Sequence, residues 1–258
     1  MTIKFPKSEK YNFNKNLVKR HKLATHLDLY LATEVENFQF TYEPKEEDHG
    51  FHPSGHCTPP PTALYQMADD DIAGLLVKKD WGTAMLKTFL VGHFWHQLLQ
   101  KAVLDLGFAE PSAIERKGYK AWGCEDDSEP RPYHYAAGSG DIAPCSIPKH
   151  GDYVVDFKTM SSHQFKTNGI PDWAADKYEA QINIYMDFFE LEQGLIVAVN
   201  KDSPHDFKEF EFERNQELID RIYDKWEFVS ACLDEGEAPS KLDDELFNDF
   251  PYTGPIAQ

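Results

Sequence analysis

Closely spaced cysteines are absent from the sequence. Four cysteines are spread over 258 residues, at Cys57, Cys124, Cys145 and Cys232. Zinc and iron–sulfur sites usually contain a Cys-x-x-Cys pair, and disulfide frameworks are typical of small secreted chains. We therefore interpret the four residues as scattered free thiols and expect neither a disulfide framework nor an iron–sulfur cluster.

Long apolar runs are absent as well. No stretch approaches the ~18 apolar residues of a membrane-spanning helix. Residues 1–22 are polar and basic and lack the apolar region of a secretory signal. We expect a cytoplasmic protein, in the host cytoplasm if a phage encodes it. The sequence also shows no internal repeat and no long low-complexity tract.

Positive charge is scarce overall, since the formal net charge is −18. This argues against a protein that coats DNA in general. Residues 1–22 differ: seven Lys or Arg residues and one Glu give a net charge of +6, so the rest of the chain carries −24. A basic arm on an acidic body suits contact with phosphates at one place, with Lys19, Arg20 and Lys22 as candidates. A solvated terminus is the alternative.

Helical and strand patterns alternate along residues 83–234. Apolar residues recur every three or four positions over 83–106, which predicts a helix that Gly107 caps. The remaining expected elements are strands at 112–122, 133–143 and 152–160, a helix at 173–191, strands at 195–200 and 207–212, and a helix at 215–234. A turn is expected at 144–151, and the Phe-and-charge alternation at 207–212 predicts a more exposed strand. The order predicts an α/β or α+β fold; we favour α/β, with helices flanking a central mixed sheet.

The residues before this core are less regular. One short helix is expected within 16–33, a loop rich in Pro, Gly and His at 52–61, and a helix at 62–78. These elements predict an N-terminal helical and irregular extension of the core.

Asp156, Phe157 and Lys158 form the first group that suggests chemistry. Residues two apart on a strand point to the same face, so the carboxylate and the ammonium project together. Two such charges on an apolar strand cost stability unless they pair with each other or bind a metal. Acid-x-Lys triplets also begin at Glu43, Glu115 and Asp206, where a surface ion pair is the simpler interpretation.

Asp141 ends the preceding predicted strand, in the segment Gly138-Ser-Gly-Asp141. If the two strands form a hairpin, Asp141 and Asp156 meet near one edge. Two carboxylates, with a backbone carbonyl and water, make an oxygen-rich site for Mg²⁺ or Mn²⁺. The alternative is an ordinary turn, in which Asp is common.

Two helices carry further polar candidates. Gln181 and Tyr185 are four residues apart and share a helix face, where they could support a site or contact a phosphate. His96 lies on the helix at 83–106, one turn after Gly92. A solvated face for the first pair and a core histidine for His96 are the alternatives, and His93 is a weaker candidate.

Together these features resemble the RecB-like and Cas4-like branch of the PD-(D/E)xK nucleases, of the stand-alone exonuclease type that phages encode. That branch carries four motifs in a fixed order. Here they read Gly92-His-Phe-Trp-His96, Gly138-Ser-Gly-Asp141, Asp156-Phe-Lys158 and Gln181-Ile-Asn-Ile-Tyr185. The segment His52-Pro-Ser-Gly-His-Cys57 is similar, more faintly, to a segment that precedes the core in many members. Some members hold an iron–sulfur cluster near the C-terminus, where this chain has only Cys232.

The resemblance implies a restriction-endonuclease-like core and a phosphodiesterase that depends on Mg²⁺ or Mn²⁺. His96, Asp141 and Asp156 would bind one or two ions, with the backbone carbonyl of Phe157 as a further ligand. Lys158 would position or deprotonate the attacking water, or stabilise the phosphate. The further implied roles are support of the site and DNA contact for Gln181 and Tyr185, and an additional acid near the metal at Glu115.

The expected organisation is a basic arm and loop at 1–60, a nuclease domain at 61–236 and an acidic tail at 237–258. The expected function is a DNA exonuclease acting on free, linear and partly single-stranded ends in recombination, repair or phage DNA processing. A structure-specific endonuclease of the same fold, an inactive DNA-end-binding recombination partner and an RNA nuclease remain alternatives. A recombination protein partner and a homo-oligomer are left open.

Overall fold

The computed structural model describes residues 22–33, 39–41, 51–53, 83–122, 134–166, 172–203 and 206–235. The predicted helix at 62–78, the contacts Lys19 and Arg20, and the tail at 237–258 lie outside these residues. The described helices are α1 (Ala24–Thr33), α4 (Thr83–Asp105), α5 (Ser162–Lys166), α6 (Asp172–Phe189) and α7 (Gln216–Glu235). The strands are β1 (Ile114–Ala121), β2 (Tyr135–Ile147), β3 (Gly151–Met160), β4 (Gln193–Asn200) and β5 (Phe207–Glu213).

The five strands form one sheet in the order β1-β2-β3-β4-β5. Strands β3 and β4 are parallel, while every other neighbouring pair is antiparallel. A parallel pair needs a crossover connection, and α5 and α6 supply it between β3 and β4. The prediction of a central mixed sheet flanked by helices is confirmed.

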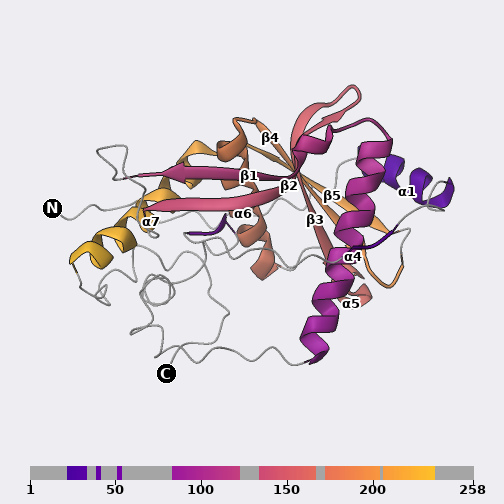
Figure 1. The fold of residues 1–258 in the computed structure, drawn as a ribbon, viewed down its shortest axis with the longest axis horizontal. Coiled ribbons are helices and arrows are strands. Elements are labelled where there is room, and N and C mark those ends of the chain that lie inside the picture. Colours follow the sequence, from indigo (N-terminus) through magenta and orange to yellow (C-terminus); the bar gives the residue numbers. More distant parts are fainter. Residues whose placement is uncertain are drawn as a thin grey trace.

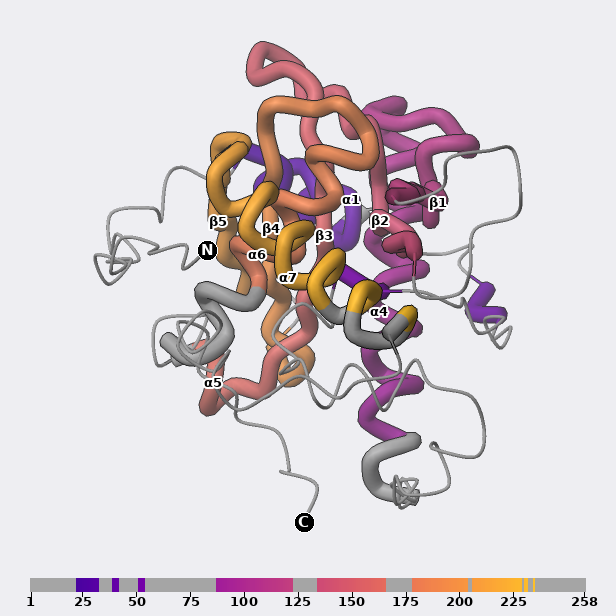
Figure 2. The backbone as a smooth tube through the Cα atoms, turned by 90° about the vertical axis from the view of Figure 1, so that its left-hand side faces the viewer, coloured from indigo at the N-terminus to yellow at the C-terminus, as the bar shows by residue number. Residues whose placement is uncertain are grey.

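Helices cover both faces of the sheet (Figure 1). On one face, α1 and α4 bury Leu27 and Leu99 against Val155 and Phe157 of β3. On the other face, α6 packs on the sheet, and α7 packs on α6 as the outer layer (Figure 2). Because neighbouring residues of β3 face opposite layers, this strand is apolar on both sides, as its sequence predicted. Within the described ranges, no helix is both long and apolar enough to cross a bilayer.

Strand β2 is longer than the sequence predicted. The expected strand stopped at residue 143 and the expected turn covered 144–151, but β2 continues to Ile147 and the turn covers residues 148–150. The register shifts between Ile142 and Cys145, so Pro144 lies in an irregular part of the strand where no ladder hydrogen bond from its nitrogen is needed. Asp141 therefore lies inside a strand and not at its end.

Strand β5 is also less exposed than predicted. Its three Phe residues and Glu209 are buried, with Glu209 only 3% exposed. The Glu209 carboxylate accepts hydrogen bonds from the backbone N–H groups of Leu23 and Ala24, both at 2.6 Å, and from that of Lys22. It thus caps the N-terminus of α1 from a distant strand, where the free N–H groups and the helix dipole favour a negative charge. The local alternation could not reveal this long-range partner.

We expect Glu209→Ala to destabilise the protein by about 2 kcal/mol, because three backbone donors lose a charged acceptor. Chemical denaturation would measure the loss, with the exposed neighbour Glu213→Ala as the control. Equal midpoints for the two variants would contradict the capping role.

Asp187 of α6 joins its helix to β1, to α7 and to the connection between β5 and α7. Its carboxylate accepts hydrogen bonds from Lys120 of β1 at 2.9 Å, from the Tyr223 hydroxyl of α7 at 2.8 Å, and from Arg214 between β5 and α7. Burial alone would raise the pKa of Asp187, but Lys120, Tyr223 and Arg214 outweigh it and lower this pKa. The ionised carboxylate therefore holds α6 and α7 to the edge of the sheet.

This lowered pKa predicts a pH-dependent effect of Asp187→Asn. The stabilisation by Asp187 is present above about pH 4, the value for an unfolded Asp, and is lost as the pH falls through the lower folded-state pKa. We expect the variant to lose about 2 kcal/mol at pH 7 and much less at pH 3. Urea denaturation at both pH values, with the exposed Asp224→Asn as control, would test this. A loss independent of pH would contradict it.

Candidate active site

The site lies where β2 and β3 separate. Their pairing ends at Ile142 and Val155; beyond this point β2 continues beside β1, while β3 continues beside β4. Asp141 and Asp156 are the next residues of the two strands, so the fork brings the two carboxylates together. The Phe157 N–H, which has no β2 backbone partner here, donates to Asp141 Oδ2 at 2.6 Å. One carboxylate thus satisfies a backbone group that the fork leaves open.

Lys158 accompanies Asp156 on the face of β3 that α6 covers. Its Nζ lies 2.7 Å from Asp156 Oδ2 and donates to Gln181 Oε1 at 3.1 Å. The same ammonium lies 5.0 Å from the centre of the Tyr178 ring, a cation–π distance. The prediction that Asp156 and Lys158 project together, with Phe157 on the opposite face, agrees with this placement.

His96 approaches from α4, which covers the other face. Its Nδ1 lies 3.4 Å from Asp141 Oδ1, and its ring meets the Phe157 ring edge-on at 6.3 Å between centres. On one side of the fork, His96 of α4 contacts Asp141 directly. On the other side, the link from Asp141 to α6 runs through Asp156 and Lys158. The structure brings the four predicted motifs to one place.

Gln181 and Tyr185 are buried beside this group, at 7% and 5% exposure. The Tyr185 ring stacks on Phe189 one turn later, at 6.3 Å between centres. A side chain at Gly138 would come within 3.2 Å of Tyr185 and 2.8 Å of Pro53, so the glycine permits α6 to lie close to β2. Burial fits the supporting role that was predicted for the pair better than direct contact with DNA.

Burial and neighbouring charges shift the acids of the site in opposite directions. Burial raises the pKa of Asp156, and the Asp141 carboxylate adds to this, although Lys158 and His96 oppose it. Burial would also raise the pKa of Asp141, but His96, Lys158 and the Phe157 N–H outweigh it and lower this pKa. Two carboxylates side by side thus titrate differently, a property common at functional sites.

Neighbouring carboxylates raise the pKa values of Lys158 and His96 against the opposing effect of burial. Burial would lower the pKa of Lys158, but Asp156 and, more weakly, Asp141 raise it. Burial would likewise lower the pKa of His96, and Asp141 and Asp156 reverse this. Burial raises the pKa of Tyr185, so its hydroxyl stays protonated. Lys158 is therefore a cation at neutral pH.

Two residues at this site were missed in the sequence. Gln100, buried on α4, donates to Glu115 Oε1 at 2.9 Å and approaches the Asp141 carbonyl oxygen at 3.5 Å. Tyr178 lies over Lys158. Spacing could have indicated both, since Gln100 is one helical turn after His96 and Tyr178 one turn before Gln181.

Other predicted contacts lie elsewhere. Lys22 donates to the Tyr153 hydroxyl at 2.7 Å and pairs with Glu211 of β5, so its charge is already used to hold the start of α1. A DNA contact by Lys22, Lys19 or Arg20 stays a prediction. Lys208, from another acid-x-Lys triplet, donates to the Phe165 carbonyl at 2.6 Å and contributes nothing to this group.

The donor types at the fork fit Mg²⁺ or Mn²⁺. Carboxylate and carbonyl oxygens suit these ions. Because the N–H and C=O of a strand residue face the same edge, we expect the Phe157 carbonyl to face the fork as its N–H does. In the arrangement seen, Asp141 is paired with His96 and Asp156 with Lys158. No group of three His, Cys, Asp or Glu residues in the described ranges is already gathered closely enough to hold an ion.

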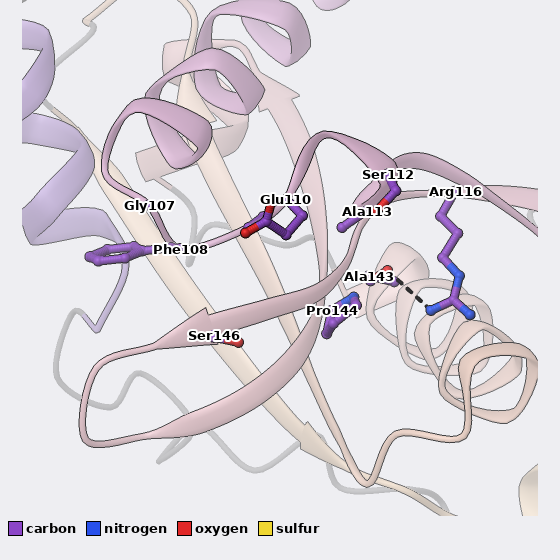
Figure 3. Close-up of a pocket in the computed structure, with 10 residues that line it drawn as sticks. Gly107, Phe108, Glu110, Ser112, Ala113, Arg116, Ala143, Pro144 and Ser146 are labelled. Atoms are coloured by element: carbon purple, nitrogen blue, oxygen red, sulfur yellow. Dashed lines mark hydrogen bonds between the residues drawn. The ribbon is translucent and has the colours of Figure 1, made fainter.

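A separate cavity of about 530 Å³ lies between the segment after α4 and the β2–β3 hairpin (Figure 3). Arg116 reaches along its edge and donates to the Ala143 carbonyl at 3.3 Å. Its lining contains Phe108, Pro144 and Ser146 but none of Asp141, Asp156 and Lys158. The reactive groups therefore lie outside this cavity.

The buried Asp156–Lys158 pair makes a testable prediction about stability. We expect Lys158→Met to cost about 3 kcal/mol in the presence of a chelator, because it leaves Asp156 charged and without its ammonium partner. Adding Asp156→Asn should recover part of this loss. Urea denaturation of both single variants and the double variant would give the coupling; strictly additive losses would mean that the two side chains do not stabilise each other.

Neither a protein-family model nor a curated protein matches the sequence. Among solved structures, the chain is similar to SSO0001 at 17% identity and a TM-score of 0.45, over 80% of this chain and 83% of that one. It is similar to the alkaline exonuclease LHK-Exo of Laribacter hongkongensis at 14% identity and a TM-score of 0.44, over 72% and 89% of the two chains. LHK-Exo in complex with dAMP gives 14% identity, a TM-score of 0.45, and coverage of 72% and 88%.

Proposed function

We propose that the chain is a divalent-metal-dependent deoxyribonuclease of the PD-(D/E)xK type, of the RecB-like branch, that degrades DNA from free ends. The observation that carries this proposal is the meeting of Asp141, Asp156 and Lys158 at the fork between β2 and β3. The order of the motifs in the sequence and their convergence in space support the same assignment.

The stability cost of this arrangement supports a chemical role. Asp141 and Asp156 are 7% and 5% exposed, and they lie side by side with like charge. Burying such a group is often less favourable than an apolar replacement of the same volume. A fold that needed only stability at this place would be better served by apolar side chains, so the charges are best explained by what they bind.

His96, Asp141, Asp156 and the Phe157 carbonyl would hold the cation or cations. A bound Mg²⁺ or Mn²⁺ supplies an activated water and a counter-charge for the phosphate. Asp141 is kept ionised by His96, Lys158 and the Phe157 N–H, which lower its pKa. Asp156 loses its only ammonium partner if Lys158 turns toward a substrate, and the cation would then compensate its charge.

Lys158 would stabilise the negative phosphate. Its ammonium is kept protonated by the nearby carboxylates, which makes it a poor base for water but a good donor to a phosphate oxygen. Gln181 accepts a hydrogen bond from it at 3.1 Å and the Tyr178 ring lies below it, so the ammonium is oriented before the substrate arrives. Tyr185, buried against Phe189, would support this side of the site.

Action on free ends is the preferred mode. In the described part of the chain, all elements belong to one sheet and its covering helices, and no second module for reading a sequence is seen. The strongly acidic body also opposes lengthwise binding along a duplex. A structure-specific endonuclease of the same fold is the second candidate. An inactive DNA-end-binding protein would have no need of the buried charges.

The deciding experiment compares end-labelled linear DNA with a closed circle in Mg²⁺ or Mn²⁺. We expect the linear DNA to be degraded, the circle to survive, and a chelator to abolish activity. Lys158→Ala should lower the rate at least ~100-fold, because it removes a preorganised charge from the phosphate.

Lys208→Ala is the matched control, since Lys208 belongs to an acid-x-Lys triplet of the same form but lies on β5 and bonds to Phe165. It should leave the rate unchanged. Cleavage of the circle would favour the endonuclease. No cleavage of either substrate would refute the assignment to DNA, and an RNA substrate tested in parallel would then distinguish a ribonuclease from a binding protein.

A further inference from the structure

Three carboxylates lie in neighbouring positions across β1, β2 and β3. Ile114 pairs with Ile142 and Arg116 with Gly140, which places Glu115 opposite Asp141. Ile142 pairs with Val155, which places Asp156 next to Asp141 on the other side. Like charges at adjacent positions of neighbouring strands repel each other. Each acid therefore needs a compensating partner.

Each carboxylate has a different partner from outside the row. His96 of α4 contacts Asp141, and Lys158 contacts Asp156. Glu115 Oε1 accepts a hydrogen bond from the side-chain amide of Gln100, at 2.9 Å from its Nε2. This amide is neutral, so it orients the Glu115 carboxylate through a hydrogen bond.

Gln100 also links Glu115 to the fork. It is 5% exposed, and its Nε2 lies 3.5 Å from the Asp141 carbonyl oxygen as well as close to Glu115. One amide group thus spans two strands. Since His96 is one helical turn earlier, the same face of α4 supplies a donor to each of the two neighbouring acids.

The backbone of Glu115 is strained where this contact is made. Its φ of 48° lies in the left-handed region, which residues with a Cβ atom rarely adopt and which costs free energy. Such conformations persist only where the surroundings fix them, and they gather at functional sites. The Gln100 amide binds the side chain of this strained residue.

We propose that Gln100 is a positioning residue, which holds Glu115 in the row with Asp141 and so sets how strongly the site takes up a divalent cation. The inference rests on the proposed function for the identity of the cation and names a residue that acts through Glu115. The hydrogen bonds of Gln100 go to Glu115 and Asp141 and not to Lys158 or Asp156. Its shorter hydrogen bond goes to Glu115 Oε1, at 2.9 Å against 3.5 Å to the Asp141 carbonyl oxygen, so we expect it to act mainly through Glu115.

The test measures cation uptake without any nucleic acid. Mn²⁺ alone is titrated against the full-length protein, and the rise in melting temperature gives a midpoint concentration. Gln100→Leu removes the donor at similar volume and should raise this midpoint about tenfold, as expected for the loss of one hydrogen bond to a charged group. Gln97→Leu is the matched control: the same substitution on the same helix, where the amide donates to the Thr41 carbonyl.

Two further variants separate positioning from packing. Gln100→Glu adds a fourth carboxylate, which should lower stability in a chelator and increase the Mn²⁺-induced rise. Glu115→Gln should raise the midpoint, and adding Gln100→Leu to it should change the midpoint no further, because Gln100 acts through Glu115. A lower stability of Gln100→Leu with an unchanged midpoint would overturn the proposal, and so would additive shifts in the double variant.

Failure of this inference can be distinguished from failure of the proposed function. If the wild type binds Mn²⁺ but cuts no DNA, the proposed function fails while the midpoints still test Gln100. If the wild type cuts DNA with Mn²⁺ and Gln100→Leu has the wild-type midpoint, the proposed function stands and Gln100 is a packing residue. A wild type that shows no Mn²⁺-induced rise overturns the inference directly.

Discussion

The hydrogen bond from the Phe157 N–H to Asp141 Oδ2 is the contact on which the arrangement of the site depends. A sheet strand that leaves its neighbour must find new partners for its backbone groups, because an unpaired buried N–H is costly. The Asp141 carboxylate provides that partner and so permits β3 to part from β2 while it pairs in parallel with β4. The fork beside Asp156 follows because a side chain replaces a strand as the partner of the Phe157 N–H.

Helices on both faces of the sheet hold the side chains at the fork. On one side α4 supplies His96 and Gln100, and on the other α6 supplies Gln181 to Lys158. Neither helix could hold these positions alone. Glu209 fixes α1, which packs with α4, and Asp187 fixes α6 to α7 and the edge of the sheet. Buried carboxylates therefore hold helices in place outside the site, and within it they are candidate metal ligands.

Much of the fold and of the site could be predicted because its signals are local. Periodicity gave α4, α6 and α7, the unbroken apolar run gave β4, and the acid-x-Lys spacing gave the pair on β3. The errors at Glu209 and Glu115 share one physical cause, a partner distant in sequence. Glu209 is buried because α1 meets it 185 residues away, and Gln100 matters because β1 brings Glu115 to it. No single-strand pattern carries that information.

The charge of the site constrains the order of events in the proposed reaction. Asp141 and Asp156 lie at the fork with Lys158, which is already paired with Asp156, so a phosphate that entered alone would meet two carboxylates. With a divalent cation bound to Asp141 and Asp156, Lys158 would be free to contact the phosphate. Under the proposed function, cation binding therefore precedes productive DNA binding. The same reasoning explains how a chain with a net charge of −18 can act on a polyanion.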